Sequence, residues 1–163
     1  MSTSLTSTTP PSFTEWIAAC HIHTAFSDGS GLLPRITSDA GAAGVNVVVV
    51  ADHNTLAPLR AGWQGWRNGV LVVVGCEIGR SHAPHCLALN ITHCRGYAQL
   101  SEDEYLCSVA AQGGFGLAAH PAGVRSRLLG LRHRPWPDLS HPALRGLELW
   151  SYPHDWVQSV LDG

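Results

Sequence analysis

Residues 20–29 read Cys-His-Ile-His-Thr-Ala-Phe-Ser-Asp-Gly and follow a short apolar run at 16–19. This pattern is typical of a strand that ends in a polar turn. Side chains two residues apart on a strand point to the same face, so His21 and His23 can hold one metal ion together. Asp28 lies in the turn and can reach back toward a neighbouring ion. Chance pairing is the alternative in a chain with 10 histidines, but the stretch favours a metal site.

The composition narrows the class of protein. At 163 residues the chain fits one domain with a real core; 45% of its residues are apolar and only 13% are charged. The net charge of −2 argues against a general nucleic-acid-binding face, which needs basic residues. All 10 basic residues are arginine, which excludes a lysine Schiff base and leaves arginine as the only permanent cation for a phosphate.

The cysteines and the N-terminus bear on localisation. The five cysteines are odd in number and form no Cys-x-x-Cys pair, so a reduced, cytoplasmic setting fits better than a disulfide framework. Residues 1–11 lack the basic and apolar parts of a signal peptide, and no apolar run approaches the ~20 residues of a membrane span. We expect a disordered lead-in at 1–13 and one domain at 14–163, with no membrane or nucleic-acid partner.

Apolar runs alternate with longer mixed segments. The run at 45–51 is β-branched with almost no polar alternation, which is typical of a strand buried on both faces of a parallel sheet. Residues 101–104 form a capping box that starts a helix. This alternation predicts a parallel α/β fold. The expected strands are 16–22, 45–51, 70–76, 85–91, 115–119 and 146–150, and the expected helical segments are 33–44, 57–68, 101–112, 124–130 and 154–162.

Ionisable residues follow the buried strands where each strand ends. In α/β barrels the active site lies at these carboxyl ends, and an unpaired buried charge is costly. A shared metal cluster would give these groups a common partner. The residues concerned are His21, His23, Asp52, His53, Glu77, His120 and, just before the last strand end, Glu148.

Some of these residues also have a plainer interpretation. Asp52 and His53 could be a helix N-cap and a surface histidine, and Glu77 could be an ordinary strand-end acid. We favour metal ligation by His53, Glu77 and His120. Pro121 follows His120 and favours an extended backbone at that histidine.

The remaining histidines and cysteines are weaker candidates. His85 opens an apolar strand and could face the site, whereas His82 lies in a loop and could be a substrate contact. Cys20 and Cys76 flank ligand positions and could be soft ligands, but small buried filler is the favoured interpretation. We expect surface roles for His93, His133, His141 and His154.

Five short motifs together resemble the PHP (polymerase and histidinol phosphatase) superfamily of metal-dependent hydrolases. Each motif is weak alone, but all five occur in the family's order and spacing. They are His21-Ile-His23-Thr-x-x-Ser-Asp28-Gly, Ala51-Asp52-His53-Asn54-Thr55, Gly75-Cys-Glu77, His85-Cys-Leu-Ala-Leu and Ala119-His120-Pro121. The segments at 85–89 and 146–150 are most similar to the CehA/McbA-type metallohydrolase branch.

The resemblance implies an α/β fold of a particular kind, a distorted (β/α)7-type, TIM-like barrel that carries two or three divalent ions of zinc, manganese or iron. A metal-bridging hydroxide would attack the phosphorus of a small phosphate ester. Glu77 and His120 would be catalytic, with Glu77 bridging the first and second ions. The implied ligands are His21 and His23 for the first ion, Glu77, His85 and His120 for the second, and Asp28 and His53 for the third.

The chain departs from the family at two places. Cys20 stands where the family usually has an aspartate that supports the ligands of the first ion. The family's last motif, Gly-Ser-Asp-x-His, supplies an aspartate to the first ion and a histidine to the third, and it does not occur before Gly163. We therefore expect a barrel that is incomplete at its C-terminus, with fewer ligands for these two ions.

Three functions stay open on the sequence alone. The first is a phosphoesterase in which Arg80, Arg125 and Arg127 bind phosphate, although the last two could be solvated helix residues. The second is an ester or carbamate hydrolase with the same metal site. The third is an inactive, metal-binding remnant. A structural zinc finger is disfavoured because the candidate ligands spread over ~100 residues, whereas a finger gathers them in short loops.

Overall fold

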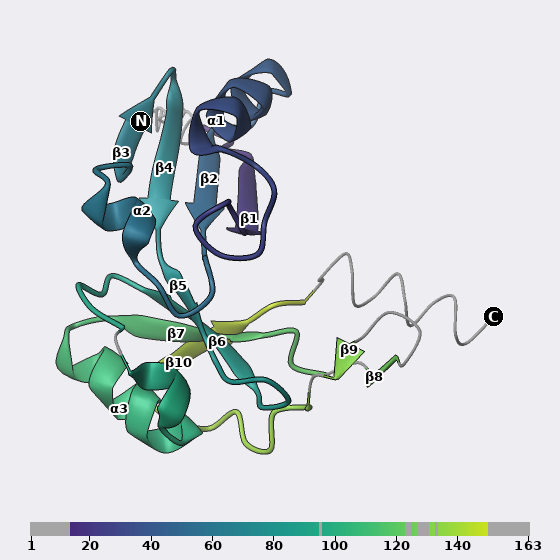
Figure 1. The fold of residues 1–163 in the computed structure, drawn as a ribbon, viewed down its shortest axis with the longest axis vertical. Helices are drawn as coiled ribbons and strands as arrows, with labels where there is room; N and C mark the ends of the chain where they lie inside the picture. The colour runs from purple at the N-terminus through teal and green to yellow at the C-terminus, as the bar shows by residue number, and fades with distance from the viewer. Residues whose placement is uncertain (1–13, 95, 123–124, 127–130, 133, 150–163) are drawn as a thin grey trace, which may run out of the picture.

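The computed structural model describes residues 14–94, 96–122, 125–126, 131–132 and 134–149. These residues form two four-stranded sheets and a small two-stranded sheet, with helices beside the two larger sheets. In Figure 1 the first sheet lies in the upper part of the molecule and the second sheet lies below it. The predicted α/β class is therefore confirmed.

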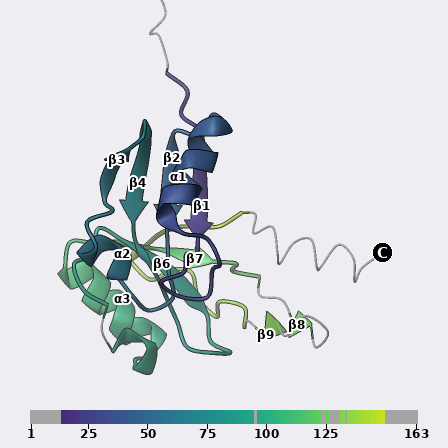
Figure 2. The ribbon, with the colours of Figure 1, turned by 45° about the horizontal axis from the view of Figure 1, so that its top comes forward.

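The first sheet has three parallel strands and an antiparallel edge strand, in the order β1-β2-β4-β3. Its strands are β1 (Ala18–Ile22), β2 (Val47–Val50), β4 (Val70–Val74) and the antiparallel β3 (Gly65–Arg67). The valines of β2 and β4 favour extended backbone. Helix α1 (Leu33–Ala42) packs on one face of this sheet, as Figure 2 shows, and joins these valines in the core.

The second sheet is mostly antiparallel, in the order β10-β7-β6-β5, and only β10 and β7 run parallel. Its strands are β5 (Cys76–Ile78), β6 (His85–Leu89), β7 (Phe115–Ala119) and β10 (Leu144–Leu147). Helix α3 (Glu102–Ala111) packs against β7 and follows a short 3-10 helix, η1 (Tyr97–Gln99). The predicted capping box is present, because the Ser101 side chain and Glu104 bond reciprocally at the start of α3.

The chain passes from the first sheet to the second at Gly75, so the predicted strand 70–76 divides into β4 and β5. A Cβ atom at Gly75 would lie 2.5 Å from Leu89 Cδ2, which leaves room only for glycine. A parallel bridge pairs His53 with Glu77, and Asn54 N donates to Glu77 O at 2.9 Å. These contacts place the end of β2 beside β5 and bring candidate ligands from both sheets together.

Several predicted elements differ from the structure. The segment 57–68, predicted as helical, contains helix α2 (Ala57–Arg60) and strand β3. The segment 124–130 was also predicted as helical, but its described part is strand β8 (Arg125–Ser126), which pairs with β9 (Leu131–Arg132). The all-parallel prediction is wrong because short connections such as 68–69 and 79–84 can only return the chain antiparallel.

Other predictions concern the whole molecule. The described residues form two four-stranded sheets, a small two-stranded sheet and no closed barrel, so the predicted TIM-like barrel is not confirmed. None of the helices in the described ranges combines the length and the apolar character that a membrane crossing requires. The expected lead-in at 1–13 and the helix at 154–162 lie outside the described residues.

Candidate metal centre

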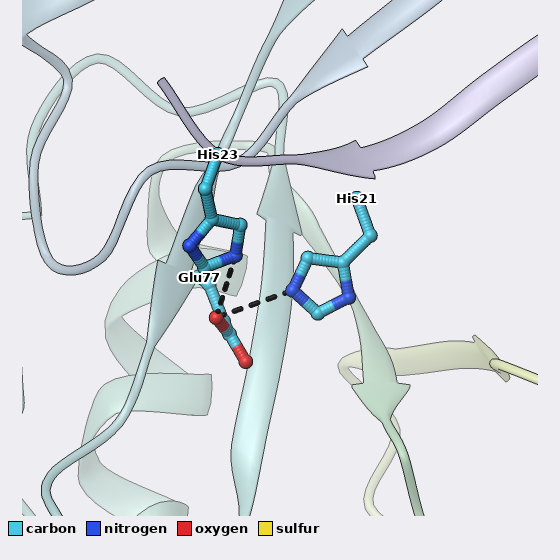
Figure 3. Close-up of side chains that lie close together, drawn as sticks. All are labelled: His21, His23 and Glu77. Carbon is cyan, nitrogen blue, oxygen red and sulfur yellow. Dashed lines mark ion pairs between the residues drawn. The ribbon is translucent and has the colours of Figure 1, made fainter. Parts of the chain in front are cut away.

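A buried carboxylate, Glu77, lies at the centre of the candidate site. The residue is 1% exposed, and Figure 3 shows two histidine rings directed at one of its oxygens. Five ring nitrogens lie 2.8–3.2 Å from the carboxylate, those of His21, His23 and His53 at Oε2 and those of His85 and His120 at Oε1. Five imidazoles thus converge on one side chain.

His21 and His23 reach Glu77 through a local distortion of β1. The pairing of β1 with β2 shifts register between Ala19 and Ile22, and His21 has a φ of +59°, which is uncommon for a residue with a side chain. His23 lies just beyond the strand, and the two ring centroids are 5.0 Å apart. The structure brings both rings together, but through a bulge and not through the regular alternation on which the prediction relied.

The turn after His23 is held by Asp52. This carboxylate is fully buried and accepts hydrogen bonds from the Thr24 amide and hydroxyl, both at 2.8 Å, and from the Ser27 hydroxyl at 2.5 Å. Asp52 therefore fixes the turn that carries Asp28. The N-cap alternative is wrong, because helix α2 begins at Ala57 and receives no side-chain cap.

Asp28 contacts two of the histidines that were predicted as ligands. Its Oδ1 lies 2.7 Å from His23 Nδ1, and its Oδ2 lies 3.5 Å from His53 Nε2. Asp28 is 65% exposed and His53 is 31% exposed, whereas Glu77 is 2% exposed by side chain. The centre is thus closed behind Glu77 and open to solvent beside Asp28 and His53.

His85 opens β6, and Gly79 gives its ring the room to reach Glu77. A Cβ atom at Gly79 would lie 2.1 Å from His85 Cδ2. Asn54 holds Gly79 from the other side, because its side-chain amide donates to Gly79 O at 2.7 Å and accepts from Gly79 N at 3.1 Å. The link between β5 and β6 is therefore shaped around the His85 ring.

His120 follows β7 and is buried, but its backbone differs from the prediction. Its φ is +30°, so the extended conformation expected before Pro121 is wrong. The amide of His120 donates to Glu148 Oε2 at 2.7 Å, and Glu148 Oε1 lies 2.6 Å from His21 Nδ1. A carboxylate that follows β10 thus contacts two of the candidate ligands.

The contacts in the centre shift the pKa values of Glu77, His21 and His53. Burial would raise the pKa of Glu77, but hydrogen bonds with four histidines, the largest from His120, hold it far below the usual value of a glutamate. Burial would lower the pKa of His21, but hydrogen bonds with Glu148 and Glu77 raise it to about 9. Burial is the largest cause that lowers the pKa of His53.

The rings of His21 and His23 show that the site suits a cation. Both nitrogens of His21 face carboxylates, Glu148 and Glu77, and both nitrogens of His23 face Asp28 and Glu77. A neutral imidazole carries one N–H and one lone pair, so one nitrogen of each ring faces an oxygen without a proton between them. A second proton or a metal ion removes this repulsion. Mixed imidazole and carboxylate donors suit zinc, manganese or iron, so the residues fit a divalent metal.

The structure brings the seven predicted ligands together, with five histidines on Glu77 and with Asp28 on His23 and His53. Three groups have ligand atoms within 4.8 Å of one another: His21, His23 and Glu77; His23, Asp28 and His53; and His53, Glu77 and His85. His53 therefore joins the group of Glu77 as well as that of Asp28. The assignment of ligands to individual ions stays a prediction.

The structure tests the arginines predicted to bind phosphate only in part. Arg80 is exposed, and its carbonyl oxygen lies 3.2 Å from His85 Nε2, so Arg80 lies near the centre. Arg125 lies in β8, and its side chain and all of Arg127 fall outside the described part of the chain. Their role stays a prediction.

Among the weaker candidates, His93 is exposed and Cys76 is buried, as expected; His82 is exposed, and its role as a substrate contact stays a prediction. Cys20 is exposed, so its interpretation as buried filler is wrong; the residue lies within the register shift of β1. His133 and His154 lie outside the described residues.

A second group of metal-ligand side chains contains His141, Asp103 and Cys107. His141 is only partly exposed, and its Nε2 lies 3.3 Å from Asp103 Oδ1, so the expected plain surface role is wrong. Its Nδ1 accepts the amide hydrogen of Ala143 at 3.1 Å. In the neutral ring the proton is therefore on Nε2, which leaves no lone pair there for a metal.

Sequence reasoning missed the roles of Asp52 and Glu148. The signal was present, since both are acids at strand ends. Their partners lie 28 and 127 residues away along the chain, and no local spacing predicts such pairs.

Comparisons with known proteins identify solved structures that share this fold. No family model and no curated protein matches the chain. One similar solved structure is a two-domain protein containing a predicted PHP-like metal-dependent phosphoesterase from Bacteroides vulgatus: identity is 21%, the TM-score is 0.59, and the match covers 89% of this chain and 48% of that one. Another is a candidate metal-dependent phosphoesterase from Bifidobacterium adolescentis, with 18% identity, a TM-score of 0.61, and coverage of 91% of this chain and 84% of that one. The chain shares their fold and spans about half the length of the first.

Proposed function

We propose that the chain is a metal-dependent phosphoesterase of the PHP superfamily that hydrolyses a small phosphate ester. The observation that carries the proposal is the buried Glu77 carboxylate with five imidazole nitrogens within 3.2 Å. The names of the two similar structures support the same chemistry. When bound, divalent ions supply a nucleophile from water at neutral pH and stabilise negative charge on the transferred phosphoryl group.

Each residue has a defined part in this proposal. Glu77 is shared by two groups of candidate ligands and is contacted by His120, and His21 and His23 complete the first group. Asp28 orients the His23 ring from the outer side. A substrate would enter beside the exposed Asp28 and the partly exposed His53. Arg80 is a candidate for binding its phosphate, because its backbone contacts His85.

The test combines metal content with hydrolysis. We expect the purified chain to bind Mn²⁺ or Zn²⁺ and to hydrolyse an aryl phosphate. Glu77→Gln removes the central negative charge with little change in volume, so metal content and rate should both fall at least ~100-fold. Glu15→Gln is the matched control, because this acid is exposed and precedes strand β1. Hydrolysis by Glu77→Gln at the parental rate would contradict the proposal.

A substrate panel separates the remaining alternatives. Aryl acetate and aryl carbamate are compared with aryl phosphate under the same metal conditions. Turnover of the carbon esters alone would replace the phosphoesterase by an ester or carbamate hydrolase. Metal binding without turnover of any of the three would identify an inactive, metal-binding protein.

A further inference from the structure

We infer that Glu148 is a positioning residue of the metal centre, which holds His21 and His120 in the conformations that let both rings reach Glu77. The sequence places Glu148 among the acids near strand ends, but the ligand set implied by the family resemblance does not contain it. The inference rests on the proposed metal centre, and it concerns the geometry of the ligands and not the identity of the substrate.

The two oxygens of Glu148 serve different partners. Oε1 lies 2.6 Å from His21 Nδ1, and Oε2 accepts the His120 amide hydrogen at 2.7 Å. The backbone amide of Glu148 donates to Ala118 O at 3.0 Å, which ties the residue to β7. Its side chain is 12% exposed, so water competes little for these bonds.

Both partners have a backbone that needs support. His21 has a φ of +59° and His120 has a φ of +30°, and residues with a Cβ atom rarely adopt such values. Strained conformations of this kind persist only where the surroundings hold them. Glu148 contacts the side chain of one strained residue and the backbone amide of the other, so one carboxylate supports both.

The contact also fixes the direction of the His21 ring. A carboxylate at Nδ1 holds the hydrogen on that nitrogen and leaves the lone pair of Nε2 for a metal. Nε2 is the atom that faces Glu77, at 3.2 Å. His21 belongs to the first sheet and His120 follows a strand of the second. Glu148 therefore also fixes the positions of these two ligands relative to one another.

Glu148→Gln is the discriminating substitution. A carboxylate accepts two N–H groups, whereas glutamine offers one oxygen and one NH₂ group. Glutamine at this position can accept from His21 or from the His120 amide, but not from both. If its oxygen takes the amide hydrogen, its NH₂ group faces His21 Nδ1 and favours the tautomer with the hydrogen on Nε2, the atom needed for a metal. Glu15→Gln again removes one negative charge at an exposed site, and thermal unfolding shows whether each variant is folded.

Two measurements without substrate test the inference. Competition with a chromophoric chelator should show that Glu148→Gln binds Mn²⁺ or Zn²⁺ about 10- to 100-fold more weakly than the parent, while Glu15→Gln does not change. Proton NMR of the metal-free, ¹⁵N-histidine-labelled chain should show a downfield ring N–H signal of His21 that Glu148→Gln loses and Glu15→Gln keeps.

An unchanged metal affinity or an unchanged His21 ring signal in folded Glu148→Gln would overturn the inference. If the parent chain binds no divalent ion, the proposed function fails, and the ring signal alone then decides whether Glu148 holds His21. A chain that binds metal but hydrolyses no phosphate ester leaves both measurements intact, so the two failures are distinguishable.

Discussion

At the scale of single residues, the charge on His21 links metal binding to pH. Burial would lower its pKa, but hydrogen bonds with Glu148 and Glu77 raise it to about 9, so the ring is protonated at pH 7. Ligation requires the Nε2 lone pair, and metal binding must therefore release this proton. We expect Mn²⁺ affinity to rise by up to ~10-fold per pH unit below about pH 9. Calorimetric titrations in two buffers of different ionisation enthalpy measure the release.

The same raised pKa stabilises the metal-free protein at lower pH. The contribution is fully present below the unfolded value of 6.5 and is lost as the pH rises through about 9. His21→Gln should remove this part of the pH dependence in urea unfolding. If metal binding released equal heats in the two buffers and His21→Gln left the pH dependence of unfolding unchanged, the raised pKa of His21 would be contradicted.

Asp52 illustrates how a residue that binds no metal can support the centre. Asp52→Ala leaves the Thr24 amide without a partner and opens a cavity, so we expect the free energy of unfolding to fall by about 3 kcal/mol. Asp52→Asn keeps the shape and most of the bonds, and we expect a loss of about 1 kcal/mol. Urea unfolding of the metal-free protein measures both.

The control for Asp52 is Asp39→Ala, which removes only an exposed ion pair with Arg35 on α1. Such a solvent-exposed pair contributes little to stability. If Asp52→Ala were no less stable than Asp39→Ala, the role of Asp52 in holding the turn would be refuted.

At the scale of elements, the short connection between β5 and β6 is shaped for His85. Gly79→Ala places a methyl group where the His85 ring now lies, so the ring must move away from Glu77. We expect metal affinity to fall at least ~10-fold while the fold is retained, as measured by chelator competition. Gly41→Ala in α1 is the control, because its Cβ atom would lie 3.6 Å from the nearest neighbour. If Gly79→Ala bound metal as tightly as the parent, the His85 ring would not need the space beside Gly79 to reach Glu77.

Which elements could be predicted depends on how local their cause is. The capping box of α3 and the valine runs of β2 and β4 are local patterns, and each element formed where it was expected. The division at Gly75 was not predictable, because the glycine is needed for a contact with Leu89 in another strand. Strand β3 was missed because its partner β4, and not its own sequence, makes it a strand.

At the scale of the whole molecule, the candidate centre joins the two sheets. His21 belongs to the first sheet, whereas Glu77 and His85 belong to the second. A metal bound between them stabilises only the folded chain, by about 2.7 kcal/mol when free metal is 100 times Kd. We expect chelation to lower Tm by roughly 5–10 °C in a chain of this size.

Differential scanning calorimetry with and without chelator measures this change in Tm. Glu77→Gln is the control, since its Tm should not respond to metal or chelator. The same Tm for metal-loaded and metal-free parent protein would contradict a centre that joins the sheets.

The sequence by itself determined which residue types stand where the buried strands end, and so predicted a metal centre with His21, His23, His53, Glu77 and His120. These positions follow from hydrophobic patterning, which acts over a few residues. Only the tertiary structure decided that Glu77 is the common partner, that β1 bulges at His21, and that Glu148 contacts both His21 and His120. Those contacts join residues 8 to 127 positions apart, and the long-range ones exist only once the two sheets have packed together.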